Sequence, residues 1–142
     1  EGGEEYRDSE KYEIKVRDWP GAEKLGMTLA PFIAQLNKIR QENVALQRLR
    51  NLEFHQTDSG AIVAYSKRDG NNLILVVVNL DPVRVQETTV HWNKYALGLP
   101  DGDFKGKDLL NGEELVWSDH TFIRLDPARP HGRVGHILKV NL

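Results

Sequence analysis

Apolar residues recur along this chain at two different spacings, and the spacing changes near residue 50. The apolar residues spaced three or four apart are Leu29, Phe32, Ile33, Leu36 and Ile39. This spacing predicts a helix with one apolar face. Thr28 is the expected N-cap, Pro31 falls in the first turn where no backbone donor is needed, and the helix is expected to end near Asn43.

Beyond residue 50 the pattern predicts short strands separated by turns. The expected strands are 52–56, 61–67, 73–80, 87–92, 107–110, 113–117, 121–124 and 135–140. Residues 69–72 and Asn111-Gly112 carry the turn chemistry of tight hairpins. Residues 73–78 are apolar without alternation, which is typical of a strand buried on both faces. About eight short strands with turns between them predict a mainly β chain that forms an antiparallel β-sandwich.

Composition and charge narrow the classes of function. The 142 residues are 39% hydrophobic and 28% charged, with a formal net charge of −2. A nucleic-acid or anionic-membrane binder is expected to carry a basic excess, so neither partner is predicted. No apolar run approaches the ~20 residues that cross a bilayer. Cysteine is absent, which excludes disulfides, thiol catalysis and cysteine-based metal sites.

Residues that carry chemistry are sparse, and no catalytic residue, metal site or cofactor is predicted. The five histidines show no helical i, i+4 pair of the kind that binds zinc, and His131 and His136 are only a weak candidate for a metal site. Glu113 and Glu114 are adjacent, so on a strand they point to opposite faces and make a poor acid–base pair. A solvated hairpin end explains them better.

Two tryptophans lead to alternative interpretations. Trp92 and Trp117 lie on expected strands, and Tyr95 closely follows Trp92. Each indole is expected either to be buried between two sheets or to form an exposed platform on which a sugar ring stacks. The first alternative gives a structural domain, and the second gives a carbohydrate-binding module.

Several strings of residues together resemble one enzyme family. They are Tyr6–Glu13, Arg17–Trp19, Leu29–Ile33, Leu36–Arg40, Asn43–Gln47, Val76–Pro82 and Ile123–Pro127. In this order they resemble the C-terminal part of bacterial α-1,4-glucan:maltose-1-phosphate maltosyltransferases, which belong to the amylase superfamily, glycoside hydrolase family 13. The strings Ser9–Glu13 and Val78–Pro82 narrow the resemblance to this subgroup.

The resemblance implies a fold and a division of the chain. Residues 1–50 would be the last loop and final helix of a (β/α)8 catalytic barrel. Residues 51–142 would be the C-terminal β-sandwich called domain C in amylases, which would stabilise that barrel. An enzyme of this family transfers maltosyl units from α-maltose-1-phosphate to the non-reducing end of α-1,4-glucans, with retention of configuration and phosphate release.

Site residues follow from the same resemblance. The family's catalytic carboxylates would lie upstream of residue 1, so this chain alone is expected to be inactive. The Lys-Tyr pair in the last barrel loop contacts the donor's maltosyl group in the family, which makes Lys11 and Tyr12 the expected substrate-binding residues.

The alternatives are an α-glucan-binding module that uses Trp92 or Trp117, and the C-terminal domain of another amylase-type enzyme. The expected location is the cytoplasm, because no signal peptide is visible and the implied donor is a sugar phosphate. We call the longer protein to which such a domain would belong the parent enzyme. A homodimer is one possible assembly of this parent enzyme.

Overall fold

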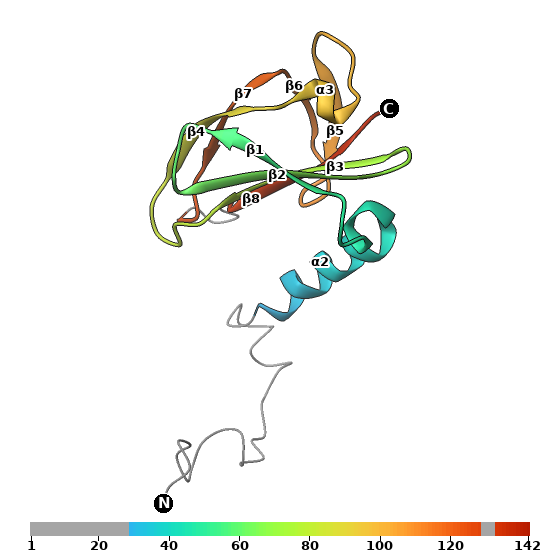
Figure 1. The fold of residues 1–142 in the computed structure, drawn as a ribbon. Helices are drawn as coiled ribbons and strands as arrows, with labels where there is room; N and C mark the ends of the chain where they lie inside the picture. Colours follow the sequence, from blue (N-terminus) through green and yellow to red (C-terminus); the bar gives the residue numbers. More distant parts are fainter. Residues whose placement is uncertain (1–28, 129–132) are drawn as a thin grey trace, which may run out of the picture. The chain divides into compact units, whose positions relative to one another are not determined.

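The computed structural model describes residues 29–128 and 133–142, and Figure 1 shows their path. These residues divide into two units: residues 29–36 belong to the first, and residues 37–142 form the second. Helix α2 (Ala30–Glu42) contributes to both and is followed by the 3-10 helix η1 (Val44–Gln47). The predicted end of the helix is confirmed: the Asn43 amide Nδ2 donates to the carbonyl of Ile39 at 2.8 Å. The expected cap Thr28 lies outside the described residues.

All eight expected strands are present. They are β1 (Leu52–Thr57), β2 (Ile62–Asp69), β3 (Asn72–Asn79), β4 (Gln86–His91), β5 (Phe104–Asp108), β6 (Glu114–Trp117), β7 (His120–Leu125) and β8 (Gly135–Val140). The sequence did not predict η1 or the one-turn helix α3 (Lys94–Leu97) between β4 and β5. Among the described residues, no helix is long and apolar enough to cross a membrane.

Strand β5 begins three residues earlier than predicted. Its inward positions hold Gly106 and Asp108 beside Phe104, while Lys105 and Lys107 point to solvent. A strand whose core-facing positions hold glycine and aspartate shows little alternation of apolar and polar residues. The hydrophobic pattern therefore predicted a start at residue 107 and not at Phe104. Both predicted hairpin turns are confirmed: one lies between β2 and β3, and the other lies between β5 and β6.

The strands form one antiparallel sheet in the order β6-β5-β8-β3-β2-β1-β4-β7. The β2–β3 hairpin closes on the Asp69–Asn72 pair, and Gly70 between them has a φ of 58°, a left-handed conformation that glycine adopts without strain. Strand β1 joins two parts of the sheet: Phe54 pairs with Tyr65 on β2, and further along Gln56 pairs with His91 on β4. The sheet therefore turns back over itself at β1 to make two layers (Figure 1).

The main core lies between the two layers, which confirms the β-sandwich. Its buried side chains alternate along facing strands, as the pleat requires. They are Ile62, Ala64, Leu73, Leu75, Val77, Val90, Trp92, Leu97, Phe104, Trp117, Ile123, Leu125, Leu138 and Val140.

Strand β3 is buried on both faces, as its unbroken apolar run predicted. Leu75 and its alternate neighbours enter the main core, while Ile74 and Val76 face the other way into a smaller cluster. Ala45 of η1 covers that cluster and is fully buried. Its backbone N–H donates to Asn72 Oδ1 at 2.9 Å, which fixes η1 on this outer face of β3.

Candidate functional site

The two predicted substrate-binding residues, Lys11 and Tyr12, lie outside the described residues, as does His131. Their roles therefore stay predictions. The other candidates from the sequence, namely the two strand tryptophans, Tyr95, the glutamate pair and the remaining histidines, all lie in the described unit 37–142.

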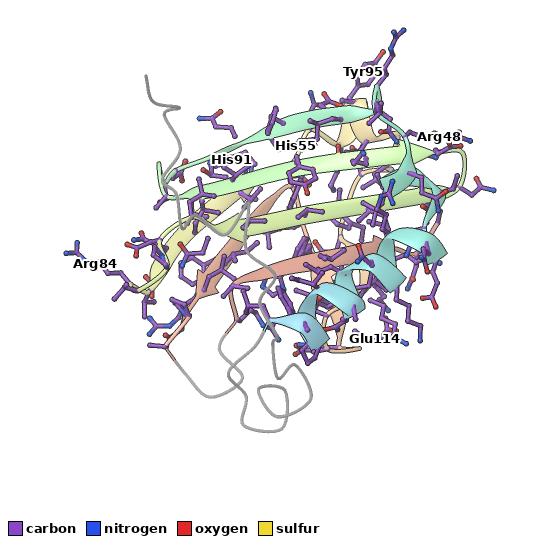
Figure 2. All side chains as sticks on the ribbon, turned by 90° about the horizontal axis from the view of Figure 1, so that it is seen from below. Arg48, His55, Arg84, His91, Tyr95 and Glu114 are labelled. Atoms are coloured by element: carbon purple, nitrogen blue, oxygen red, sulfur yellow. The ribbon has the colours of Figure 1, made fainter. Side chains whose placement is uncertain are left out.

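Trp92 and Trp117 are both core residues and stack on each other. Their ring centroids are 5.6 Å apart, and the ring planes are inclined by 12°. Trp92 is 4% exposed and Trp117 is 6% exposed. A ring face that is covered by another indole cannot stack on a sugar. The prediction of a sugar platform on Trp92 or Trp117 is therefore wrong, and the alternative of an indole buried between two layers is confirmed. Tyr95, by contrast, is 96% exposed and projects away from the strands in Figure 2.

His55 on β1 forms a buried hydrogen-bonded contact with Ser66 on β2. His55 Nε2 is 2.8 Å from Ser66 Oγ, and the backbone N–H of Asn93 donates to His55 Nδ1 at 3.3 Å. Because Nδ1 accepts, Nε2 carries the proton of the neutral ring and donates to Ser66. Burial lowers the pKa of His55, while the Glu53 carboxylate raises it by a smaller amount. A ring in this tautomer cannot take the serine proton, so the pair is structural and not a nucleophile with its base.

The outer faces of β1, β4 and β7 carry a cluster of polar side chains. His91 and His120 are directly paired across β4 and β7, and their Nδ1 atoms are 2.7 Å apart. On its other side, the His91 ring bonds to Asp58 through Nε2, at 2.8 Å from Oδ1. Since a carboxylate only accepts, His91 Nε2 donates and its Nδ1 accepts from His120 when both rings are neutral. Gln56 on β1 pairs with His91 and extends this row.

Two hollows open on either side of the His91–His120 pair. The first, of about 370 Å³, lies where β1 and β4 diverge and is lined by Glu53, Phe54, His55, Gln56, His91, Trp92 and Asn93. The second, of about 350 Å³, lies beside the β6–β7 connection and is lined by Asp103, Val116, Trp117, Ser118, His120, Thr121 and Phe122. Each hollow thus contains one histidine of the pair, one member of the tryptophan stack and one exposed phenylalanine.

His136, for which the sequence suggested a weak metal candidate, is bonded to a buried carboxylate. Its Nδ1 lies 2.8 Å from Asp108 Oδ2, and Arg133 bridges this pair to the exposed Glu113 through a 2.9 Å bond. Burial raises the pKa of Asp108, but the bonds from His136 and from the Leu110 backbone N–H outweigh it and hold the pKa below its usual value. Hydrogen bonding and charge from Arg133 likewise lower the pKa of Glu113.

Glu113 therefore ends a hairpin and holds an arginine, which supports the expectation that the Glu113–Glu114 pair is not an acid–base site. Among the described residues, no group of three or more histidine, aspartate or glutamate side chains could hold a metal ion. Sequence reasoning missed the outward-facing Phe54 and Phe122 and the pairing of His91 with His120. Strand alternation could have placed each on the outer face, but only the register between distant strands brings them together.

Comparison with known proteins gives a family match. Residues 54–140 match the family described as "GLGE, C-terminal". Over 138 residues the chain is 49% identical to the alpha-1,4-glucan:maltose-1-phosphate maltosyltransferase 2 of Streptomyces coelicolor, covering 96% of this chain and 21% of that protein. It is 44% identical to the enzyme of the same name in Mycobacterium tuberculosis, over 99% of this chain and 20% of that protein. The chain thus spans about a fifth of the length of these relatives.

Two solved structures with a similar fold are alpha-amylases. A maltogenic alpha-amylase from Thermotoga neapolitana matches with a TM-score of 0.57 and 20% identity, over 76% of this chain and 24% of the amylase. An Anoxybacillus alpha-amylase matches with a TM-score of 0.54 and 16% identity, over 80% of this chain and 23% of that one. At these identities the likeness concerns the fold, which is that of an amylase-type β-sandwich.

Proposed function

Because this chain belongs to the family of GLGE C-terminal domains, we propose that it is the C-terminal part of an α-1,4-glucan:maltose-1-phosphate maltosyltransferase. The parent enzyme would transfer maltosyl units from α-maltose-1-phosphate to the non-reducing end of an α-1,4-glucan. Configuration would be retained and phosphate released. The observation that carries the proposal is the 44–49% identity to relatives of that name over nearly the whole chain.

Most of the chain would have a structural part in this reaction. Residues 1–50 would complete the catalytic barrel, and the sandwich of residues 51–142 would stabilise it. Apolar residues left exposed on helix α2 support this role: Phe32 is 37% and Ile33 is 52% exposed, and Ile39 is the buried member of the same stripe. Apolar surface of this kind is characteristic of an interface with further protein.

Two residues would contact the substrate directly. Lys11 supplies ammonium donors and Tyr12 supplies a hydroxyl, both suited to sugar hydroxyls, and we place them against the donor's maltosyl group. The catalytic carboxylates would be contributed by the preceding part of the parent, so this chain would be inactive by itself. We place the parent in the cytoplasm, where a sugar-phosphate donor would be formed.

The test is phosphate release by the parent enzyme. Incubation with α-maltose-1-phosphate and a malto-oligosaccharide should release phosphate and lengthen the acceptor by two glucose units per step. Lys11→Ala and Tyr12→Phe should raise the KM for the donor, and Lys67→Ala, on the sandwich, is the matched control that should leave it unchanged. Transfer of glucan chains without phosphate release would identify another amylase-type enzyme and overturn the proposal. Phosphate release by the 142-residue chain alone would contradict its predicted inactivity.

A further inference from the structure

The two outer faces of the sandwich differ in polarity. Three outward-facing pairs cross the layer of β4 and β7, and they are Glu87–Arg124, Thr89–Phe122 and His91–His120. Phe122 is the one apolar member of this set. The Arg124 guanidinium bonds to the Glu87 carboxylate, and the two histidines bond to each other, so this face is suited to contact with water.

The outer face of the other layer carries an unbroken row of apolar residues, which we call the apolar row. One residue from each of four neighbouring strands forms it, in register: Phe54 on β1, Tyr65 on β2, Val76 on β3 and Ile137 on β8 (Figure 1). The Phe54 ring packs edge-on against Tyr65, with centroids 6.3 Å apart, yet Phe54 stays 67% exposed. Tyr65 and Ile137 are half-buried. Because the opposite outer face is polar, this apolar face has the character of a surface that further protein covers.

Helix η1 covers only part of this face. Ala45 of η1 packs with Val76 on β3, while Phe54, two strands away on β1, stays exposed. The side chain of Asn72 fixes η1 in this place: its Oδ1 accepts from the Ala45 backbone N–H at 2.9 Å, and its Nδ2 donates to Asn43 Oδ1 at 3.1 Å. The backbone that leads into the sandwich is therefore fixed beside the apolar row.

The length of the relatives indicates what could cover the apolar row. The chain spans 21% of the Streptomyces coelicolor relative and 20% of the Mycobacterium tuberculosis relative, so about four fifths of such an enzyme lies outside it. The matched family is one of C-terminal domains, which places this larger part before the chain. Because the backbone enters the sandwich through η1, the larger part is tethered on the layer that carries the apolar row.

We infer that the apolar row is the surface through which the sandwich docks on the catalytic part of the parent enzyme, upstream of residue 1. This inference rests on the function proposed above, in which the sandwich stabilises that part. Docking buries the Phe54 ring and the accessible edges of Tyr65 and Ile137, and the removal of this apolar surface from water supplies the stabilisation. The outer face of β4 and β7 stays in water, so Phe122 remains exposed in the parent.

Hydroxyl-radical footprinting of the wild-type parent tests the inference without any substitution. Phe54 and Phe122 have the same side chain and nearly equal exposure in the sandwich, at 67% and 65%, so they oxidise at similar rates unless further protein covers one of them. Oxidation of Phe54, followed by mass spectrometry of the peptides, should be at least about fivefold slower than oxidation of Phe122. Equal rates, or slower oxidation of Phe122, would overturn the inference.

A charge placed in the apolar row should weaken the docking. Phe54→Asp would bury a carboxylate without a partner, so the melting temperature of the parent should fall by at least about 3 °C. Phe122→Asp is the matched control and should change the melting temperature by less than about 1 °C. Equal melting temperatures for the two variants would contradict the docking. In sedimentation, the Phe54→Asp parent should keep the wild-type mass, and a halved mass would assign the apolar row to a second copy of the parent and overturn the inference.

Phosphate release, measured on the same wild-type parent, separates this inference from the proposed function. The footprint requires no catalysis. Protection of Phe54 in a parent that releases no phosphate from α-maltose-1-phosphate would confirm the docking and contradict the proposed function. Phosphate release by a parent in which Phe54 and Phe122 oxidise at equal rates would support the proposed function and overturn the docking.

Discussion

The indole of Trp92 stacks on that of Trp117 in the centre of the sandwich, with centroids 5.6 Å apart. Trp92 directly follows β4, which lies near one end of the strand order. Trp117 is the last residue of β6, which lies at the other end. β4 and β6 are not hydrogen-bonded neighbours in the sheet, so the stacked indoles bring two distant parts of the sheet into contact. His55 and His136 pack against opposite members of the stack, at 5.0 Å and 5.6 Å between ring centroids.

Truncation of the stack should strongly destabilise the sandwich. Trp117→Ala removes a buried aromatic side chain and leaves a cavity, so we expect the free energy of unfolding to fall by about 3–5 kcal/mol. Urea denaturation followed by circular dichroism measures this change. Tyr95→Ala, which truncates a solvent-exposed aromatic ring, should stay within about 0.5 kcal/mol of the wild type. A similar, small effect of both substitutions would contradict the role assigned to the stack.

The bond between Asp108 and His136 should also be a strong determinant of stability. Asp108 is fully buried and bonded at 2.8 Å to His136, so Asp108→Asn breaks a buried pair and should cost about 3 kcal/mol of unfolding free energy. Exposed Asp101 offers the matched control: Asp101→Asn should be close to neutral. Unchanged denaturant midpoints for Asp108→Asn would refute the prediction.

The lowered pKa of Asp108 predicts how the free energy of unfolding changes in acid. Its pKa is lower in the folded chain than its ordinary value of 3.8, so the folded state binds fewer protons than the unfolded state in this range. The stabilisation is complete above pH 3.8 and is lost as the pH falls through the folded pKa. Unfolding free energies measured between pH 5 and pH 2 should therefore fall less steeply in Asp108→Asn than in the wild type.

His55 should add a pH dependence at higher pH. Burial lowers its pKa below 6.5, so stability is complete above 6.5 and falls as the pH drops from there through the folded pKa. In an NMR titration of the chain, the His55 ring resonance should have its midpoint below 6.5. His55→Gln should remove this component of the pH dependence between pH 7 and pH 5. A midpoint at or above 6.5 would show that the ring is not desolvated.

Gly135 should not tolerate a side chain. A Cβ at this position, where β8 pairs with β3, would lie 2.5 Å from the carbonyl oxygen of Val77, which is fixed in the sheet. We expect Gly135→Ala to lower the melting temperature, at a cost of about 1–3 kcal/mol. Gly60→Ala is the control, because a Cβ there meets nothing within 4 Å. Equal melting temperatures for the two variants would contradict the close approach.

The strands were the most predictable part of the fold, because each carries its own local signal. Strand β8 begins and ends at the residues that the sequence indicated, and the two-residue turn at Gly70 was visible in its composition. Helices η1 and α3 were missed because they span only four residues each, which is too short for a helical period to appear. Strand β5 was misplaced because glycine and aspartate occupy its inward positions.

The sequence by itself determined the class of fold, the positions of the turns and the family resemblance, since these depend on residues close together in the chain. Tertiary structure alone decided that Trp92 meets Trp117, that His91 meets His120 and that His136 meets Asp108. The physical reason is that strand alternation sets only the face on which a side chain lies. Its partner across the sheet or the core depends on the register and folding-over of strands that are distant in the sequence.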